Sequence, residues 1–411
     1  MEAITTTFSI SEIRKRFPVL NQDVNGKPLI YFDNAASSQT VDTAVKSVVN
    51  FYEKDHANIH RGIHTLAERS TRSYEETRER VHQFINSPEV DEIIFTKGTT
   101  ESINLVAQSW GSANLKAGDE IILSQLEHHS NIVPWQLIAQ KTGAKIRVIP
   151  INEKGELILS EYRNLLSSRT KMVAVNYISN SLGTINPVKE IIRLAVEAGA
   201  TTLIDAAQAS PHIKLDVQDL DCDFLAFSSH KMYGPTGVGI LYGRRDILES
   251  IPPYQGGGEM IKDVSFTETT YNDIPYKFEA GTPNIGDVIA FKDAMDFIEE
   301  LGHEAIQAHE NELLSYATEK LNKVDGFRAI GTAANKASVI SFLIDGVHPY
   351  DLGQLLDVKG IAVRTGHHCT QPLMEHLGID GTVRASFSVY NTKEEIDLFC
   401  DALEQIISRF R

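Results

Sequence analysis

A lysine that follows an apolar run is the first residue of this chain that could do chemistry. The run FLAFS (224–228) leads into Ser229, His230 and Lys231, and glycines stand at 234, 237 and 239. Glycine and proline let the backbone turn away sharply after the lysine. An amine fixed at a strand end, beside hydroxyl and imidazole donors, suits an aldehyde ligand that also carries a phosphate. Taken alone, Lys231 fits a surface lysine better, so the interpretation depends on its companions.

Two further strand ends carry side chains that would complete such a site. Asp205 ends the apolar run TTLID (201–205), and Gln208 lies one helical turn later. A buried carboxylate needs a cation; a protonated pyridine nitrogen is one, although a helix cap explains Asp205 equally well. His128 lies in SQLEHHSN (124–131), where a flat imidazole can stack on an aromatic ring. A single histidine is more often structural.

A fourth run offers a place for a phosphate. In FTKGTTESIN (95–104), a strand meets a helix through Thr99 and Thr100. Free N–H groups at a helix start, with two hydroxyls, suit a phosphate dianion, and a simple helix cap is equally compatible. Together the four runs supply a phosphate cradle, a stacking ring, a carboxylate for a ring nitrogen and an amine for an aldehyde. This combination predicts bound pyridoxal 5′-phosphate (PLP).

A cysteine in a polar loop suggests a second kind of chemistry. The segment RTGHHCTQPLM (364–374) presents Cys369 after a strand, and His367, His368 and Arg364 close by would stabilise its thiolate. A buried structural cysteine is the common alternative, but this loop is too polar for a core; Cys222 and Cys400 fit that role better. A zinc site would need further Cys or His ligands at suitable spacing, and none is evident, so we expect no metal.

The elements that position these residues alternate along the chain. Short apolar runs at 93–95, 120–124, 145–151, 172–178, 201–207, 224–228 and 238–243 read as strands, and 132–141 and 189–198 read as helices. This alternation predicts an α/β fold with a mainly parallel seven-stranded sheet covered on both faces. Most of the polar runs follow strands, at the sheet edge where such folds bind ligands.

The second part of the chain has a different pattern. Residues 249–285 are rich in Gly, Pro, Tyr and Thr and are expected to be irregular, and 286–323 are expected to be helical. A smaller α/β unit follows, with strands at 337–344 and 360–364 and helices at 349–358 and 392–409. We expect a large domain over 29–296 and a small C-terminal domain over 297–411, with 1–28 packing on the latter. His56, His60 and His64 have helical spacing, but Gly62 makes a helix and a metal site there doubtful.

Composition limits the class of protein. The chain has 411 residues and a formal net charge of −16, which disfavours nucleic acid or an anionic membrane as a partner. Three cysteines cannot build a disulfide framework and suggest a reducing compartment. We see neither a secretory signal nor an apolar stretch long enough to span a membrane. The expected location is the cytoplasm.

The motifs resemble those of one family over essentially the whole chain. They include YFDNAASSQT (31–40), HANIHRGIHTLAERST (56–71), TKGTTESIN (96–104), LEHHSNIVPW (126–135), SNSLGTINPV (179–188), SSHKMYGPTG (228–237), RTGHHCTQPLM (364–374) and VRASFSVYNT (383–392). The sequence is similar to class V aminotransferases of PLP fold type I (aspartate-aminotransferase-like), and more narrowly to SufS-type, group II cysteine desulfurases.

The resemblance implies a role for each candidate residue. Lys231 would hold PLP as a Schiff base, Asp205 would pair with the ring nitrogen, and Gln208 with the ring hydroxyl. His128 would stack on the ring and take part in catalysis with Lys231 and Cys369. Further cofactor contacts would come from Thr99, Thr100, Ser228 and His230, and from Thr282 of the second subunit of a homodimer. The substrate site would contain Ala35, Asn180, Arg364, His367 and Arg384.

The resemblance also implies an activity. L-cysteine would become L-alanine, with its sulfur captured as a persulfide on Cys369 and passed on for iron–sulfur cluster assembly. Tyr350 stands where desulfurases served by a zinc-bearing SufU-type acceptor carry a histidine, which favours a SufE-type acceptor. Selenocysteine lyase is expected as a side activity. The alternatives are selenocysteine lyase or cysteine-sulfinate desulfinase as the main activity, or a non-catalytic scaffold.

Overall fold

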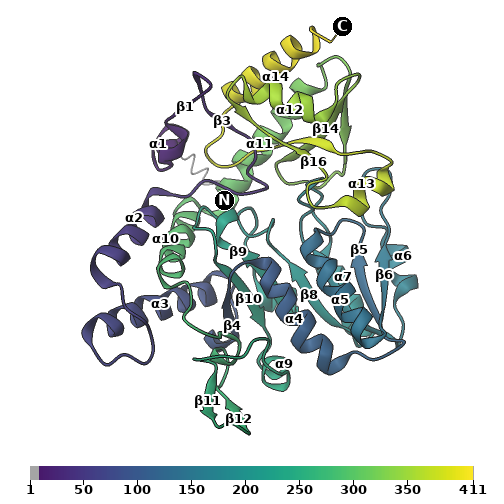
Figure 1. Ribbon diagram of the computed structural model, residues 1–411. Coiled ribbons are helices and arrows are strands. Elements are labelled where there is room, and N and C mark those ends of the chain that lie inside the picture. Colours follow the sequence, from purple (N-terminus) through teal and green to yellow (C-terminus); the bar gives the residue numbers. More distant parts are fainter. Residues whose placement is uncertain (1–8, 411) are drawn as a thin grey trace, which may run out of the picture.

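A seven-stranded sheet is the central element of the structure, a computed structural model that describes residues 9–410 (Figure 1). In sheet order its strands are β4 (Ile93–Thr96), β10 (Gly239–Gly243), β9 (Phe224–Ser228), β8 (Thr201–Asp205), β7 (Thr170–Asn176), β5 (Glu120–Ser124) and β6 (Lys145–Ile149). β10 runs antiparallel to both neighbours, and the other pairs are parallel. The predicted α/β fold with a mainly parallel seven-stranded sheet is confirmed.

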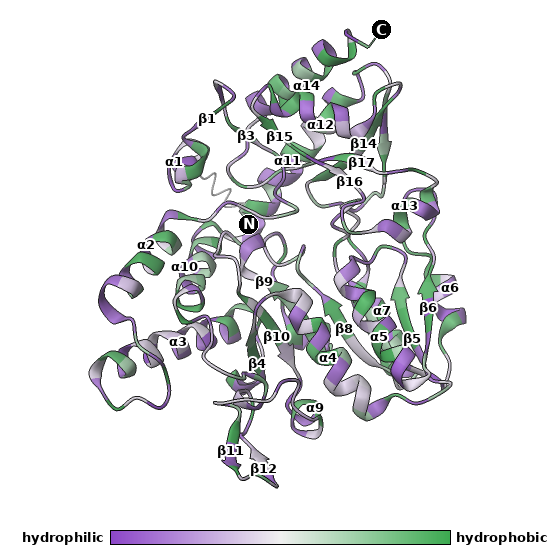
Figure 2. Cartoon of the chain, in the orientation of Figure 1, coloured by the Kyte–Doolittle hydropathy of each residue, from purple (hydrophilic) through white to green (hydrophobic). Residues whose placement is uncertain are grey.

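Apolar side chains on both faces of this sheet explain why helices cover both sides. In β7, Met172 and Ala174 join one buried cluster, whereas Val173 and Val175 join another, because successive strand residues point to opposite faces. The first face is covered by α4 (Thr99–Asn114), α5 (Val133–Thr142) and α9 (Arg245–Ser250), and the second by α3 (Thr65–Phe84), α7 (Val188–Glu197) and α10 (Ile285–Leu301). In Figure 2 the strands are largely green and the covering helices carry purple on their outer faces.

A smaller antiparallel sheet is formed by the C-terminal part of the chain. Its order is β13 (Phe327–Ile330), β14 (Val339–Ile344), β17 (Thr382–Ser386) and β16 (Arg364–Gly366). Apolar residues of α11 (His303–Leu321), α12 (Pro349–Asp357) and α14 (Lys393–Ile407) pack with it in a separate cluster. The helical stretch expected over 286–323 is thus two helices, α10 and α11, separated at Gly302, whose φ is +79°.

Two predicted segments differ in detail. The strand expected at 360–364 is divided: β15 (Ile361–Ala362) pairs in parallel with β3 (Ile30–Tyr31), and β16 joins the small sheet. Within 249–285, expected to be irregular, β11 (Ile261–Val264) and β12 (Thr269–Tyr271) form a hairpin that projects from the molecule (Figure 1). The prediction is wrong there because an exposed hairpin buries neither face and so lacks the apolar alternation that marks a strand.

The N-terminal segment packs against residues near the large sheet and residues near the small sheet. α1 (Ile10–Lys15) is followed by the fully buried Phe17, whose ring meets the edges of Tyr233, Phe297 and Tyr390. Arg14 donates to the carbonyl oxygen of Tyr390. Residues 1–8 of the predicted 1–28 segment lie outside the described residues, and the division into domains at 296 remains our proposal.

Two other expectations concern helices. Residues 56–64 are not helical and α3 begins at Thr65, so the three histidines at 56, 60 and 64 do not share a helix face. Across residues 9–410, no helix combines the length and apolar character that a membrane crossing requires.

Candidate active site

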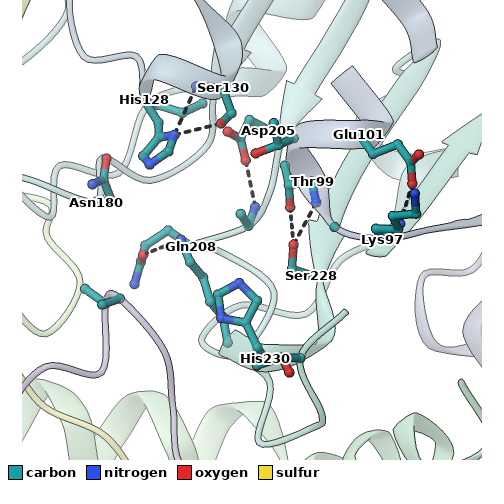
Figure 3. A pocket seen from close by; sticks show the side chains of 18 of the residues that line it. Lys97, Thr99, Glu101, His128, Ser130, Asn180, Asp205, Gln208, Ser228 and His230 are labelled. Carbon is teal, nitrogen blue, oxygen red and sulfur yellow. Dashed lines mark hydrogen bonds between the residues drawn. The ribbon is translucent and has the colours of Figure 1, made fainter. Parts of the chain in front are cut away.

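A cavity of about 830 Å³ opens where the carboxyl ends of β7, β8 and β9 meet the start of α4 (Figure 3). The small sheet closes it from the other side with Arg364 of β16 and Arg384 of β17. The predicted site residues that line it are Ala35, Thr99, Thr100, His128, Asn180, Asp205, Gln208, Ser228, His230, Lys231, Arg364 and Arg384. The polar runs singled out in the sequence therefore converge on one cavity, as expected for strand ends of a parallel sheet.

Lys231 is presented by a short 3-10 turn, Ser229–Lys231, directly after β9. Its amine donates to Oε1 of Gln208 over 3.4 Å. Burial lowers the pKa of this amine to about 8; the nearby Asp205 carboxylate opposes the shift, and Arg384 and Arg364 reinforce it. About a tenth of the amine is thus uncharged and nucleophilic at pH 7, far more than for an ordinary lysine.

Asp205 is a buried carboxylate, 5% exposed, at the last position of β8. Its Oδ1 accepts a hydrogen bond of 3.0 Å from the Ala207 amide (Figure 3), and within residues 9–410 no Lys, Arg or His lies within ion-pair distance of it. Burial raises its pKa, and the Ala207 amide and Lys231 oppose that rise. Burying a carboxylate without a paired cation is unfavourable, so this residue suits a ligand that brings a cationic nitrogen.

The start of α4 lines one end of the cavity. The Thr99 amide donates to Oγ of Ser228 over 2.8 Å, and the two hydroxyls lie 2.6 Å apart (Figure 3). Gly239 makes this approach possible, because a Cβ there would lie 2.4 Å from the Cα of Gly98. Thr100 is exposed to the cavity. A helix start with two threonines and a serine fits a phosphate.

Two imidazoles face the same space. Nδ1 of His128 accepts from the Ser130 amide over 3.1 Å, so in the neutral ring the proton is on Nε2. Burial, with Lys231 next, lowers the pKa of His128 to about 3. Burial and Lys231 also lower the pKa of His230 to about 4, and its Nδ1 lies 3.3 Å from Oγ of Ser37. Both rings are therefore neutral at neutral pH.

A guanidinium pair forms the opposite wall. Arg384 is 1% exposed and donates to Oδ1 of Asp33 over 3.0 Å and to the carbonyl oxygen of Asn180 over 2.9 Å. Its Nε is buried without a hydrogen-bond acceptor among the described residues. Arg364 pairs with the other oxygen of Asp33 at 3.4 Å. One carboxylate between two guanidiniums leaves a net positive charge, which suits an anionic substrate group.

Cys369 lies beside the cavity, on the loop between β16 and α13 (Gln371–Leu377). It is exposed, and neither Cys369 nor the exposed His367 is part of the cavity wall. His368 lines the cavity, but its ring is buried, with Nε2 2.7 Å from Oγ1 of Thr382. Burial and the two arginines hold the pKa of His368 well below its usual range. The expectation that both histidines lend positive charge to the thiolate is wrong for His368, which is neutral.

A further predicted site residue does not line the main cavity, and some residues that line it were not predicted. Thr282 lies apart from the main cavity and lines a neighbouring one of about 220 Å³. Sequence reasoning missed Tyr254 and Gln255, which line both cavities, and Glu101, which accepts from the Lys97 amide over 2.6 Å. Tyr254 and Gln255 come from the segment expected to be irregular, where no pattern marks them. Glu101 lies inside TKGTTESIN and was visible in the sequence.

Comparison with protein families gives one assignment that spans the chain. The family model described as aminotransferase class-V matches residues 30–399. A cysteine desulfurase of Pectobacterium carotovorum is 48% identical over 97% of this chain and 98% of its own length. A cysteine desulfurase of Synechococcus elongatus is 49% identical over 97% of this chain, and a probable one of Mycolicibacterium paratuberculosis is 51% identical. The chain spans 64% and 58% of the length of these last two relatives.

Solved structures agree with the fold. The cysteine desulfurase CsdA of Escherichia coli superposes with a TM-score of 0.91 at 38% identity, covering 98% of this chain and 99% of its own. The apo cysteine desulfurase of Thermococcus onnurineus gives a TM-score of 0.92 at 40% identity, covering 97% and 98%. The predicted class V aminotransferase family and the predicted fold are both confirmed.

Proposed function

This chain belongs to the class-V aminotransferase family, and we propose that it is a PLP-dependent cysteine desulfurase of the SufS type. The observation that carries the proposal is the convergence of Lys231, Asp205 and Arg384 on one cavity. An amine of lowered pKa, a buried carboxylate without a cation and a buried guanidinium with a free Nε fit an aldehyde, a pyridine nitrogen and a carboxylate. Those are the groups of PLP and of an amino acid.

The residues present fit PLP at each end of the cavity. Lys231 would bond to the aldehyde, Asp205 would pair with the ring nitrogen, and Gln208, already within reach of Lys231, with the ring hydroxyl. The neutral His128 would lie on the ring face. Thr99, Thr100, Ser228 and His230 would hold the phosphate, with Thr282 of a second subunit. When bound, PLP withdraws electrons from the substrate α-carbon.

Substrate binding would use the arginine wall. The free Nε of Arg384 and the amide of Asn180 would hold the carboxylate of L-cysteine, with Ala35, Arg364 and His367 around it. Because Asp33 and Asn180 fix the guanidinium of Arg384, little rotamer entropy is lost on binding. The uncharged amine of Lys231 would take the α-proton.

Cys369 would capture the sulfur. Its thiolate attacks the substrate sulfur, so an S–S bond forms and the substrate C–S bond breaks. The electron pair of the broken bond stays with the substrate carbon, which takes up a proton. In sum, L-cysteine and the Cys369 thiol give L-alanine and a persulfide on Cys369. Dividing the transfer into two steps lowers each barrier.

The proposal also covers the sulfur acceptor, the cellular location, the oligomeric state and a side activity. A SufE-type protein in the cytoplasm would take the sulfur for iron–sulfur cluster assembly; the exposed Tyr350, in place of a histidine, supports that type. The enzyme would be a homodimer, since Thr282 lies outside the cavity of its own chain. Selenocysteine lyase would be a side activity.

Mass spectrometry of the cysteine-treated holoenzyme tests this function. We expect one added sulfur atom on the peptide that contains Cys369, and none in Cys369→Ala. The variant should keep the visible absorbance of bound cofactor and lose cysteine turnover by about 100-fold or more. Cysteine turnover that survives in Cys369→Ala would contradict the persulfide step. A parent enzyme that turns over selenocysteine but not cysteine would make selenocysteine lyase the main activity. A colourless protein without turnover would indicate a scaffold.

A further inference from the structure

The backbone around Cys369 is held in a conformation that side chains rarely adopt. His368 has φ +51° and Cys369 has φ +57°, two consecutive left-handed residues that are not glycine. This conformation crowds Cβ against the following carbonyl. It persists only where surrounding contacts over-determine it. The contacts of this loop should therefore include those that fix the position of the thiol.

His129 supplies two of these contacts, one to Cys369 itself and one to Gln371, two residues later. Its backbone N–H donates to the carbonyl oxygen of Cys369 over 2.8 Å. Its ring Nε2 accepts from the Gln371 N–H over 3.0 Å. One residue of the 3-10 turn His129–Asn131, which follows β5, thus holds both Cys369 and Gln371.

The remaining contacts hold the neighbours of Cys369 rather than the cysteine itself. Asn180 donates from Nδ2 to the carbonyl oxygen of His368 over 2.8 Å. The hydroxyls of Ser181 and Thr370 lie 2.6 Å apart. Gln125 donates to the carbonyl oxygen of Pro372 over 3.0 Å, further along the loop.

The ring of His129 has the right protonation state for its contact. A backbone N–H can only donate, so Nε2 must carry a lone pair and the ring proton is on Nδ1. Burial, and the nearby His367, lower the pKa of His129. The ring is therefore neutral at neutral pH and remains an acceptor.

We propose that His129 is the positioning residue that holds Cys369 in line with the substrate sulfur. The inference rests on the proposed role of Cys369 as the sulfur acceptor. His128, the preceding residue, lies on the cavity side of the same turn (Figure 3), with its ring centre 6.3 Å from that of His129. This one turn then positions both the His128 ring that would meet the cofactor and the loop that carries the thiol. The cofactor and the thiol would therefore keep a fixed position relative to each other.

Substitution separates the ring contact from the backbone contact. In His129→Gln, Oε1 can take the place of Nε2 as acceptor, whereas His129→Leu and the shorter His129→Asn remove the acceptor at that distance. All three keep the backbone N–H. Gln125→Ala removes a contact to the same segment at Pro372, three residues beyond Cys369, and is the matched control.

Single-turnover measurements on the holoenzyme test the proposal. With excess cysteine, we follow the change of cofactor absorbance, which reports substrate binding and proton removal, and separately the persulfide on Cys369 by rapid quench and mass spectrometry. In His129→Leu and His129→Asn we expect persulfide formation to slow by about 10- to 100-fold, since misplacement by about 1 Å has effects of this size. The absorbance change should keep its rate and cysteine dependence within about twofold. His129→Gln should restore most of the rate, and Gln125→Ala should match the parent.

Several results would overturn the proposal. It fails if persulfide formation is unchanged in His129→Leu, if Gln is no better than Leu and Asn, or if both steps fall together, which is what a general structural role produces. If His129→Leu does not fold, the comparison of His129→Gln with His129→Asn decides. Failure of the proposed function is a different outcome: Cys369→Ala would then retain cysteine turnover, whatever the His129 variants do.

Discussion

The amine of Lys231 offers a direct quantitative test of the site. In the apoenzyme we expect it to titrate near pH 8, because burial lowers the pKa to about 8 from the 10.5 of an ordinary lysine. At pH 7.5 an amine of pKa 8 is about one quarter uncharged, whereas an ordinary lysine is about 0.1% uncharged. The buried site thus makes the nucleophilic form roughly 200-fold more abundant. Reaction with the PLP aldehyde should be faster in proportion.

The assay follows the visible absorbance after PLP is added to apoenzyme across the neutral and alkaline range. The rate should rise with pH to a midpoint near 8. Asp205→Asn removes the carboxylate that favours the charged amine, so its midpoint should move to lower pH; Arg364→Gln removes a repelling cation and should move it higher. Lys141→Met, on the exposed surface of α5, should leave the midpoint unchanged. A rate that keeps rising to a midpoint near that of free lysine would refute the reasoning.

Three further changes test the supporting structure. Gly239→Ala places a Cβ 2.4 Å from the backbone before α4 and should weaken PLP binding about tenfold or more in an absorbance titration. Arg78→Leu leaves the carboxylate of Glu279, at 2.7 Å, buried and unpaired, and should lower the free energy of unfolding in urea by about 3–5 kcal/mol; Arg80→Leu, whose partners are half exposed, should cost about 1 kcal/mol or less. His128 has a folded pKa of about 3 against 6.5, so the unfolded chain takes up a proton first as pH falls. The free energy of unfolding should therefore fall below about pH 6.5, by up to about 1.4 kcal/mol per pH unit more than in His128→Gln.

The sheet and the cofactor end of the site could be predicted because both depend on local sequence. A strand buried on both faces is apolar throughout, so its end is marked by the first polar residues, as at Asp205 and Ser228. Parallel strands bring those ends to one edge, so placing the residues requires no knowledge of distant contacts. This is why Lys231 and Asp205 were found together.

Contacts between distant segments could not be predicted in this way. Arg78 meets Glu279 across 201 residues of sequence, and nothing local marks either residue as buried. Tyr254 reaches the cavity from a segment without periodicity. The left-handed backbone of Cys369 could not be predicted either, since glycine and asparagine are the residues that normally indicate such a conformation.

The source of positive charge for the thiolate shows how the structure alters the sequence argument. Sequence proximity pointed to His367 and His368, but His368 is kept neutral by burial and by the arginines. The nearby basic side chains are instead Lys231 and Arg384, both of which line the cavity. These cations belong to the substrate site rather than to the loop. Because the force between charges falls with distance, the contacts that position Cys369 also set how far its sulfur lies from these basic groups.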